Sequence, residues 1–181
     1  MTPDTPRHGE PNQRVAILLH GSQCTGKTIT ARLLWGRDPI SLDDGKYEQL
    51  RIADDILVAE LGCGERIPYD PQAPPGPTRN PSAWRRVLAE ENRELFVFRF
   101  RADLNVILER ARLETERGVT EKTATSSHQA YESNHILVTF PADAGIEEFL
   151  MDTTNLTNAK VVEQIRQEVA KSRPVQHWPA L

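Results

Sequence analysis

Three mainly apolar segments dominate the hydrophobic pattern of the chain. They are Val15–His20 (VAILLH), Ile56–Glu60 (ILVAE) and Leu95–Phe100 (LFVFRF), and each has the length of a strand. Runs without polar alternation are typical of strands that a parallel sheet buries on both faces. Two shorter segments, Ile40–Leu42 and Phe149–Met151, are predicted to be further strands. The pattern therefore predicts a sheet of five strands.

Segments compatible with helices lie between and after these strands. The predicted helices are Thr28–Trp35, Lys46–Ala53, a segment from Asn80 or Ser82 to about Asn92, Leu104–Arg117, Ala130–Val138 and Asn158–Lys171. In Leu104–Arg117 the apolar residues fall at helical spacing. Strands that alternate with helices predict an α/β fold with a parallel sheet and helices on both faces.

Four segments fit neither pattern. Residues 66–80 contain five prolines, which no regular helix or central strand tolerates, so we expect an irregular loop there. Residues 118–129 are polar and rich in Thr and Ser, a composition typical of a mobile flap. Residues 1–13 and 172–181 carry prolines and few apolar side chains, and we expect them to be loose tails. One domain over residues 14–171 is the resulting expectation.

Length and composition narrow the class of protein. The chain has 181 residues, of which 38% are hydrophobic, enough for one packed core. No apolar run approaches the roughly 18 residues of a membrane span, and no signal-peptide pattern is visible, so we expect a soluble cytoplasmic protein without a membrane partner. The two cysteines, Cys24 and Cys63, exclude a disulfide framework and a four-cysteine zinc site.

The charge pattern bears on the ligand. The net charge of −4 argues against a protein that coats nucleic acid. Between residues 79 and 122, however, all basic residues except Lys122 are arginines, whose planar guanidinium suits phosphate and carboxylate groups. This bias points to anionic substrates. For most of these arginines the alternative is a solvated helix face with glutamate partners.

Residues 21–28, which read GSQCTGKT, fit the phosphate-loop pattern G-x-x-x-x-G-K-[ST]. The motif lies between a predicted strand and a predicted helix, where backbone N–H groups and the helix N-terminus can surround phosphates. The candidate phosphate-binding residues are Gly21, Ser22, Gln23, Cys24, Thr25, Gly26, Lys27 and Thr28. Lys27 would reach the β- and γ-phosphates, and the hydroxyl of Thr28 would ligate Mg²⁺. The alternative is an ordinary glycine turn.

Carboxylates at the ends of predicted strands are candidates for chemistry, because ligands of open parallel sheets bind there. Glu60 ends the run ILVA and would hold Mg²⁺ beside the phosphate loop, unless it is a surface acid at a turn. Asp43 ends the second strand, where it could accept the proton of an attacking hydroxyl. Asp44 competes for this role, and either acid could instead cap the next helix. Lys46 could pair with an anionic group on the acceptor, or be solvated.

Two arginines near the flap are candidates for the nucleotide site. A lid covering about residues 112–135 would bring Arg117 to the charge that develops during phosphoryl transfer, and its closure would exclude water. Arg110 suits stacking near the nucleotide base. Thr153 and Asn155, after the last strand, could line an adenine pocket, although turn formation alone explains their composition.

Together these residues resemble a known family. The loop GSQCTGKT after VAILLH, Asp43, the strand ILVAE and the arginine-bearing helix and flap before a DTTN loop resemble small P-loop kinases of the nucleoside monophosphate kinase fold. The likeness is to the shikimate-kinase-like and polynucleotide-kinase-like branch and covers residues 14–171. It implies a three-layer fold with a lid, a five-stranded parallel sheet in the order 2-3-1-4-5, and ATP with Mg²⁺ as the phosphoryl donor.

The acceptor segment departs from that family in one respect. The stretch LDDGKY resembles the segment of polynucleotide kinases that carries the general base, with a basic residue three positions on. Here that residue is Lys46, where such kinases tend to carry arginine. The proline-rich loop 66–80 has no obvious counterpart.

The sequence thus predicts an ATP-dependent kinase with a hydroxyl group as acceptor, acting as a monomer or homodimer. A nucleotide or nucleic acid is the favoured acceptor, either a 5′-hydroxyl end or a hydroxymethylated pyrimidine in DNA, because Arg85 and its neighbours Arg79 and Arg86 could line an anionic groove. A kinase of small metabolites or antibiotics is the first alternative. A nucleotide-gated ATPase switch without an acceptor is the second.

Overall fold

The computed structural model describes residues 14–42, 47–62, 81–114, 118–134, 148–172 and 178 of the chain. In chain order its elements are β1 (Arg14–Gly21), α1 (Lys27–Trp35), β2 (Ile40–Ser41), the 3-10 helix η1 (Tyr47–Arg51), β3 (Ile56–Leu61), α2 (Pro81–Glu90), β4 (Arg93–Arg101), α3 (Leu104–Leu113), α4 (Glu121–Asn134), β5 (Glu148–Asp152) and α5 (Asn158–Ser172). The predicted N-terminal tail, the proline-rich loop and most of the C-terminal tail lie outside the described residues.

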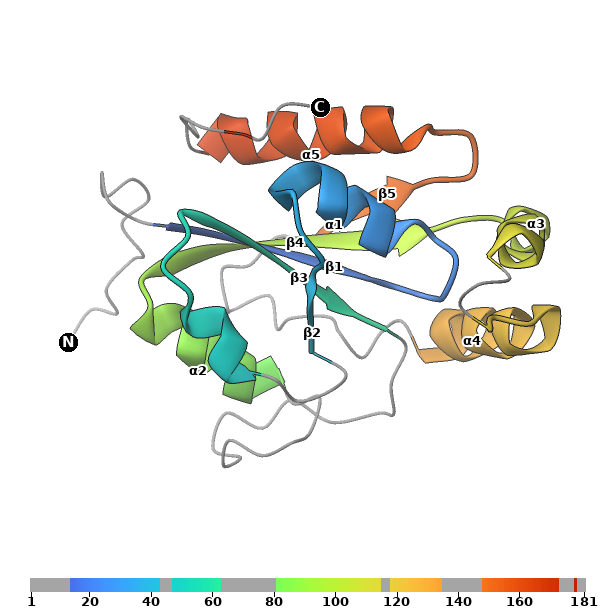
Figure 1. Ribbon diagram of the computed structural model, residues 1–181, viewed down its shortest axis with the longest axis horizontal. Helices are drawn as coiled ribbons and strands as arrows, with labels where there is room; N and C mark the ends of the chain where they lie inside the picture. Colours follow the sequence, from blue (N-terminus) through green and yellow to red (C-terminus); the bar gives the residue numbers. More distant parts are fainter. Residues whose placement is uncertain are drawn as a thin grey trace.

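The strands form one parallel sheet in the order β2-β3-β1-β4-β5, which confirms the predicted order. β1 occupies the centre and pairs with β3 on one side and β4 on the other. Helices α1 and α5 cover one face of the sheet, while η1 and α2 cover part of the other (Figure 1). Helices α3 and α4 lie beyond the carboxyl ends of the strands (Figure 1). The three-layer α/β fold is therefore as expected.

Two apolar cores explain why the central strands read as continuous apolar runs. Successive side chains of a strand point to opposite faces. In β1, Val15, Ile17 and Leu19 pack in the core beneath α1 and α5. Ala16 and Leu18 pack in the core beneath η1 and α2. Because both faces of β1 are covered, no position along its middle can be polar without a partner.

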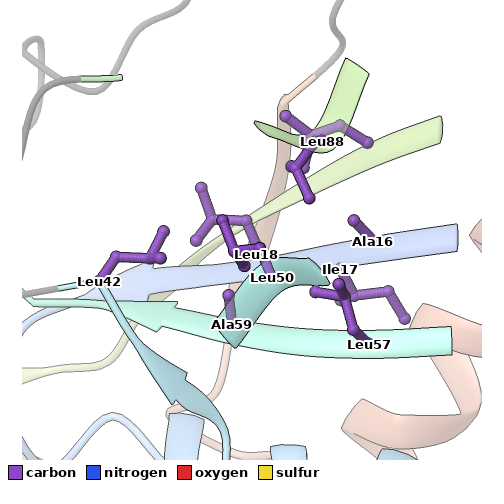
Figure 2. Close-up of a pocket in the computed structure, with 9 residues that line it drawn as sticks. Ala16, Ile17, Leu18, Leu42, Leu50, Leu57, Ala59 and Leu88 are labelled. Atoms are coloured by element: carbon purple, nitrogen blue, oxygen red, sulfur yellow. The ribbon is translucent and has the colours of Figure 1, made fainter. Parts of the chain in front are cut away.

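The second core contains a small cavity of about 10 Å³ between the sheet, η1 and α2 (Figure 2). Its walls are entirely apolar and include Leu18, Leu50, Leu57 and Leu88. A space of this size is at the lower limit for one water molecule, which would find no polar partner there. The cavity is a packing defect of the core and not a ligand site.

Helix α4 occupies most of the predicted flap, residues 118–129, and its last residues, 130–134, coincide with the start of the helix predicted over Ala130–Val138. The segment is helical from Glu121. Reciprocal hydrogen bonds between Thr120 and Thr123 satisfy backbone N–H groups at the start of this helix. Ala124 is fully buried against α3. The Thr- and Ser-rich composition is misleading because these hydroxyls cap the helix and bond its own carbonyls, as Thr125 does with Glu121.

Other boundaries shift by a few residues. Helix α3 ends at Leu113, earlier than the predicted Arg117. The helix predicted over Lys46–Ala53 is the short 3-10 helix η1. Helix α5 begins as predicted behind Thr157, whose hydroxyl accepts a hydrogen bond from the backbone N–H of Lys160. In the described part of the chain, no helix is long and apolar enough to cross a membrane.

Truncation of a central side chain tests the two-sided packing. Phe98 is fully buried on β4 and stacks on Phe149, with ring centroids 5.2 Å apart. We expect Phe98→Ala to lower the free energy of unfolding by about 3–5 kcal/mol, measured by urea denaturation. Leu113→Ala is the matched control, because Leu113 is 79% exposed and its truncation should change stability by less than about 0.5 kcal/mol. Equal effects of the two substitutions would contradict the assigned core.

Candidate active site at the phosphate loop

The motif GSQCTGKT forms a tight loop between the end of β1 and the start of α1. Two of its residues have left-handed backbone conformations, Cys24 with φ of 58° and Gly26 with φ of 96°. Gly21 closes β1, where an added Cβ would lie 2.4 Å from the carbonyl oxygen of Phe100. A glycine is therefore required at position 21 by close approach of β4. The loop leads directly into the first turn of α1, and the N-terminus of a helix is a favourable place for an anion.

Lys27 and Thr28 lie where the motif predicts them. The Lys27 ammonium is largely buried and donates hydrogen bonds to the carbonyls of Gly21 and Ser22, at 2.7 Å each. The Thr28 hydroxyl donates to Oε2 of Glu60 at 3.0 Å. Glu60 reaches this position because β3 lies beside β1 in the sheet. The structure thus brings the Lys27 ammonium, the Thr28 hydroxyl and the Glu60 carboxylate together at the carboxyl ends of β1 and β3.

A second set of hydrogen bonds joins the loop to α3 and to the segment that follows β5. The guanidinium of Arg110 on α3 donates to the carbonyl of Cys24 at 3.3 Å and to the carbonyl of Thr153 at 2.7 Å. The buried hydroxyl of Thr153 lies 3.0 Å from the carbonyl of Thr25, to which it donates. Burial lowers the pKa of Arg110 from its ordinary value. Arg110 and Thr153 therefore hold the loop by hydrogen bonds from α3 and from the segment after β5. Asn155 lies in the same segment after β5 and is exposed.

Helix α4 also contacts the phosphate loop. The backbone N–H of Gln23 donates to the hydroxyl of Ser127 at 3.1 Å. Ala124 of the same helix packs in a small apolar cluster that Cys24 joins. Arg112 of α3 pairs with Glu121 of α4, a partner that sequence spacing within α3 did not suggest. The two helices thus lie directly against the predicted nucleotide site.

Several predicted site residues cannot be placed. Asp43, Lys46 and Arg117 lie outside the described residues. Arg85 belongs to α2, but its side chain is not described. The roles of these four residues therefore stay predictions from the sequence.

His20 is a buried polar residue that the sequence analysis did not single out. It precedes the phosphate loop, is fully buried, and its Nε2 lies 2.5 Å from Oε1 of Glu148 at the start of β5. Burial lowers the pKa of His20 below its ordinary value of 6.5, and the hydrogen bond to Glu148 opposes this shift in part. A histidine at the end of an otherwise apolar run was the one signal that could have revealed it.

The sheet order and the loop geometry define the P-loop class of α/β folds. Neither the protein-family models nor the curated proteins include a match to this chain. Fourteen chains of solved structures do match. Among them is the YorR protein of Bacillus subtilis, solved in complex with phosphorylated GDP, with a TM-score of 0.54 and 16% sequence identity. The match covers 86% of this chain and 96% of YorR, and at this identity it shows a shared fold.

The buried state of His20 predicts a dependence of stability on pH. Since its pKa is lower in the folded protein, the unfolded chain binds a proton first as the pH falls. We expect the free energy of unfolding to be insensitive to this group above about pH 7.5. Below about pH 6.5 it should fall by up to about 1.4 kcal/mol per pH unit.

The measurement is urea denaturation of wild type and His20→Gln between pH 8 and pH 5. Glutamine can still donate to Glu148 but does not titrate, and the other histidines are the same in both proteins. The difference between the two curves should therefore show the proton uptake of the unfolded state. Parallel curves over the whole range would show that His20 is not held neutral.

Proposed function

We propose that the protein is an ATP-dependent kinase that transfers the γ-phosphoryl group to a hydroxyl of a nucleotide or nucleic acid. The observation that carries the proposal is the convergence of Lys27, Thr28 and Glu60 at the phosphate loop. If the loop were an ordinary glycine turn, a buried ammonium, a hydroxyl and a carboxylate would not be expected together at the carboxyl ends of β1 and β3. The fold shared with YorR, solved with phosphorylated GDP, supports a nucleotide as ligand.

In this proposal the donor nucleotide binds across the loop. The N–H groups of residues 21–28 surround its phosphates, and Lys27 exchanges its bonds to the loop carbonyls for phosphate oxygens. Arg110, Thr153 and Asn155 lie on the side where the base would rest. Arg110 donates hydrogen bonds to the carbonyls of Cys24 and Thr153, so it holds this side of the site in place. The flat face of its guanidinium would also stack near the base.

The donor set at Thr28 and Glu60 fits Mg²⁺. Both side chains offer oxygen atoms, which this cation prefers, and their 3.0 Å contact places the two oxygens side by side. When bound, Mg²⁺ would neutralise charge on the β- and γ-phosphates. Thr28 and Glu60 would hold the cation, and Lys27 would orient the same phosphates from the other side of the loop.

The transfer step assigns roles to Asp43 and Arg117. The acceptor hydroxyl attacks the γ-phosphorus, the bond to the β,γ-bridging oxygen breaks, and ADP leaves with the electron pair of that bond. Asp43 accepts the proton of the hydroxyl. Arg117 faces the negative charge that spreads over the equatorial oxygens, and the lid formed with α4 excludes water. The assignment of Asp43 rests on its position in the sequence after β2, and that of Arg117 on its position in the sequence before α4.

Two alternatives stay open. A hydroxylated metabolite or antibiotic would need the same donor site and the same base, so only the acceptor differs. A nucleotide-gated ATPase switch would use the donor site alone and need no base that faces an acceptor.

Incubation with γ-labelled ATP and Mg²⁺ distinguishes these functions. The acceptors are 5′-hydroxyl oligonucleotides, DNA with hydroxymethylated pyrimidines, nucleosides, nucleoside monophosphates and hydroxylated metabolites. We expect label on a nucleotide or nucleic acid. Label on a metabolite alone would replace the favoured acceptor by the first alternative. Release of labelled phosphate without any labelled acceptor would favour the switch.

Substitution of the proposed base tests the transfer step. Asp43→Asn should lower the rate of transfer by about 10²–10⁴-fold and leave the affinity for ATP nearly unchanged, because the amide cannot accept the proton. Asp44→Asn is the matched control, with the same chemical change one residue away. Full transfer by Asp43→Asn would show that the assignment is wrong, and loss with Asp44→Asn instead would move the base to Asp44.

A further inference from the structure

The sheet face opposite α1 carries polar side chains in its carboxyl half. Helix α2 and η1 cover the amino half of this face, over the apolar core that includes Leu18 and Val97 (Figure 1). Beyond them the same face presents His20 from β1, Arg99 from β4 and Glu148 from β5. The alternation of the strands places all three on this face.

Arg99 lies next to the phosphate loop. It pairs in register with His20, the residue immediately before Gly21. Its positive charge is close enough to His20, as is that of Lys27, to disfavour protonation of the imidazole. Two residues further along β4, Arg101 forms an ion pair with Glu132 of α4, at 3.5 Å. Arg99 therefore lies beside the strand end that leads into the phosphate loop, and two residues before Arg101, which contacts α4.

Arg99 differs from the other described arginines of β1 and β4. Arg14 and Arg93 both donate to the carbonyl of Ile52, and Arg101 pairs with Glu132. Arg99 is half-buried, yet it makes no hydrogen bond or ion pair with any residue that the structure describes. A partly desolvated guanidinium without acceptors is unfavourable, and an anionic ligand with paired oxygens would satisfy it.

The surroundings of Arg99 favour an anion. The neighbouring imidazole of His20 is fully buried, this burial lowers its pKa, and its Nε2 is hydrogen-bonded to Oε1 of Glu148. The carboxylate of Glu148 is thereby engaged by His20 and makes no ion pair with Arg99. This arrangement leaves the Arg99 guanidinium without a described acceptor on the sheet face away from α1, beside the strand that leads into the phosphate loop.

We propose that Arg99 is a specificity-determining residue that binds a phosphate group of the acceptor, next to the hydroxyl that is phosphorylated. This inference deepens the proposed kinase function and rests on it. It selects, among the acceptors above, those that carry a phosphate: a nucleotide, or a nucleotide unit within a nucleic acid. An uncharged nucleoside or metabolite would leave the guanidinium without acceptors.

The test uses acceptors that differ by one phosphate. One pair is a nucleoside and its 3′-monophosphate, and a second is hydroxymethyldeoxycytidine and its 5′-monophosphate. A hydroxymethylated oligonucleotide distinguishes a free nucleotide from a nucleotide unit in DNA. Binding is measured by calorimetry with a non-hydrolysable ATP analogue in the donor site, and transfer is measured with labelled ATP and Mg²⁺.

The variants are Arg99→Gln, Arg99→Lys and the control Arg101→Gln, which removes the same charge two residues along the same strand. Wild type and Arg101→Gln should bind the phosphorylated member of at least one pair at least tenfold more tightly than its partner. Arg99→Gln should abolish this preference while ATP affinity stays unchanged. Arg99→Lys should retain part of it, and it replaces the glutamine variant if thermal unfolding shows that Arg99→Gln is not folded.

The outcomes separate the inference from the proposed function. A preference that survives in Arg99→Gln, or that wild type lacks, overturns the role of Arg99 even if transfer proceeds. A preference that depends on Arg99, without transfer to any acceptor, supports the anion site and overturns the kinase. Dependence of both binding and transfer on Arg99 supports the two together.

Discussion

The position of the phosphate loop depends on the burial of β1 on both faces. A strand that is covered by α1 and α5 on one side and by η1 and α2 on the other cannot move in its plane or rotate about its axis without exposing apolar side chains. Each buried aliphatic side chain contributes about 1.5–3 kcal/mol. The loop that follows Gly21 therefore starts from a fixed point. Its neighbours Glu60 and Phe100 are fixed with it, because β3 and β4 pair with the same strand.

On this fixed base, hydrogen bonds from several elements hold a loop with two left-handed residues. Glu60 of β3 accepts from Thr28, Arg110 of α3 donates to Cys24, and Thr153 after β5 donates to Thr25. Each bond satisfies a polar group that would otherwise be partly buried without a partner. These bonds therefore hold the loop in one shape, and preorganisation of this kind reduces the cost of binding a ligand.

The described arginines have different physical roles, and several of them, such as Arg51, Arg101 and Arg112, pair with carboxylates. Arg14, Arg93 and Arg110 are tied to backbone carbonyls, where five donors in a plane join segments that are distant in sequence. Burial lowers the pKa of Arg93 to about 10, which still leaves it charged near neutral pH. Arg99 has no such acceptor among the described residues. The arginine-rich middle of the chain thus combines arginines that join distant segments with one that makes no hydrogen bond or ion pair with a described residue.

The sequence by itself determined the fold class and the phosphate-loop motif. Continuous apolar runs require burial on both faces of a strand, and the spacing of glycines, Lys27 and Thr28 specifies a phosphate loop, so both are local properties that a single sequence shows. Only the tertiary structure decided which distant residues meet. The contact of His20 with Glu148 spans 128 positions, and Arg110 reaches Thr153 across 43. Such pairs depend on strand order and on the angle at which α3 packs, which no local pattern encodes. The first part of α4, residues 121–129, was missed for a related reason, because its Thr and Ser residues favour a loop by composition and the burial of Ala124 against α3 is a tertiary contact.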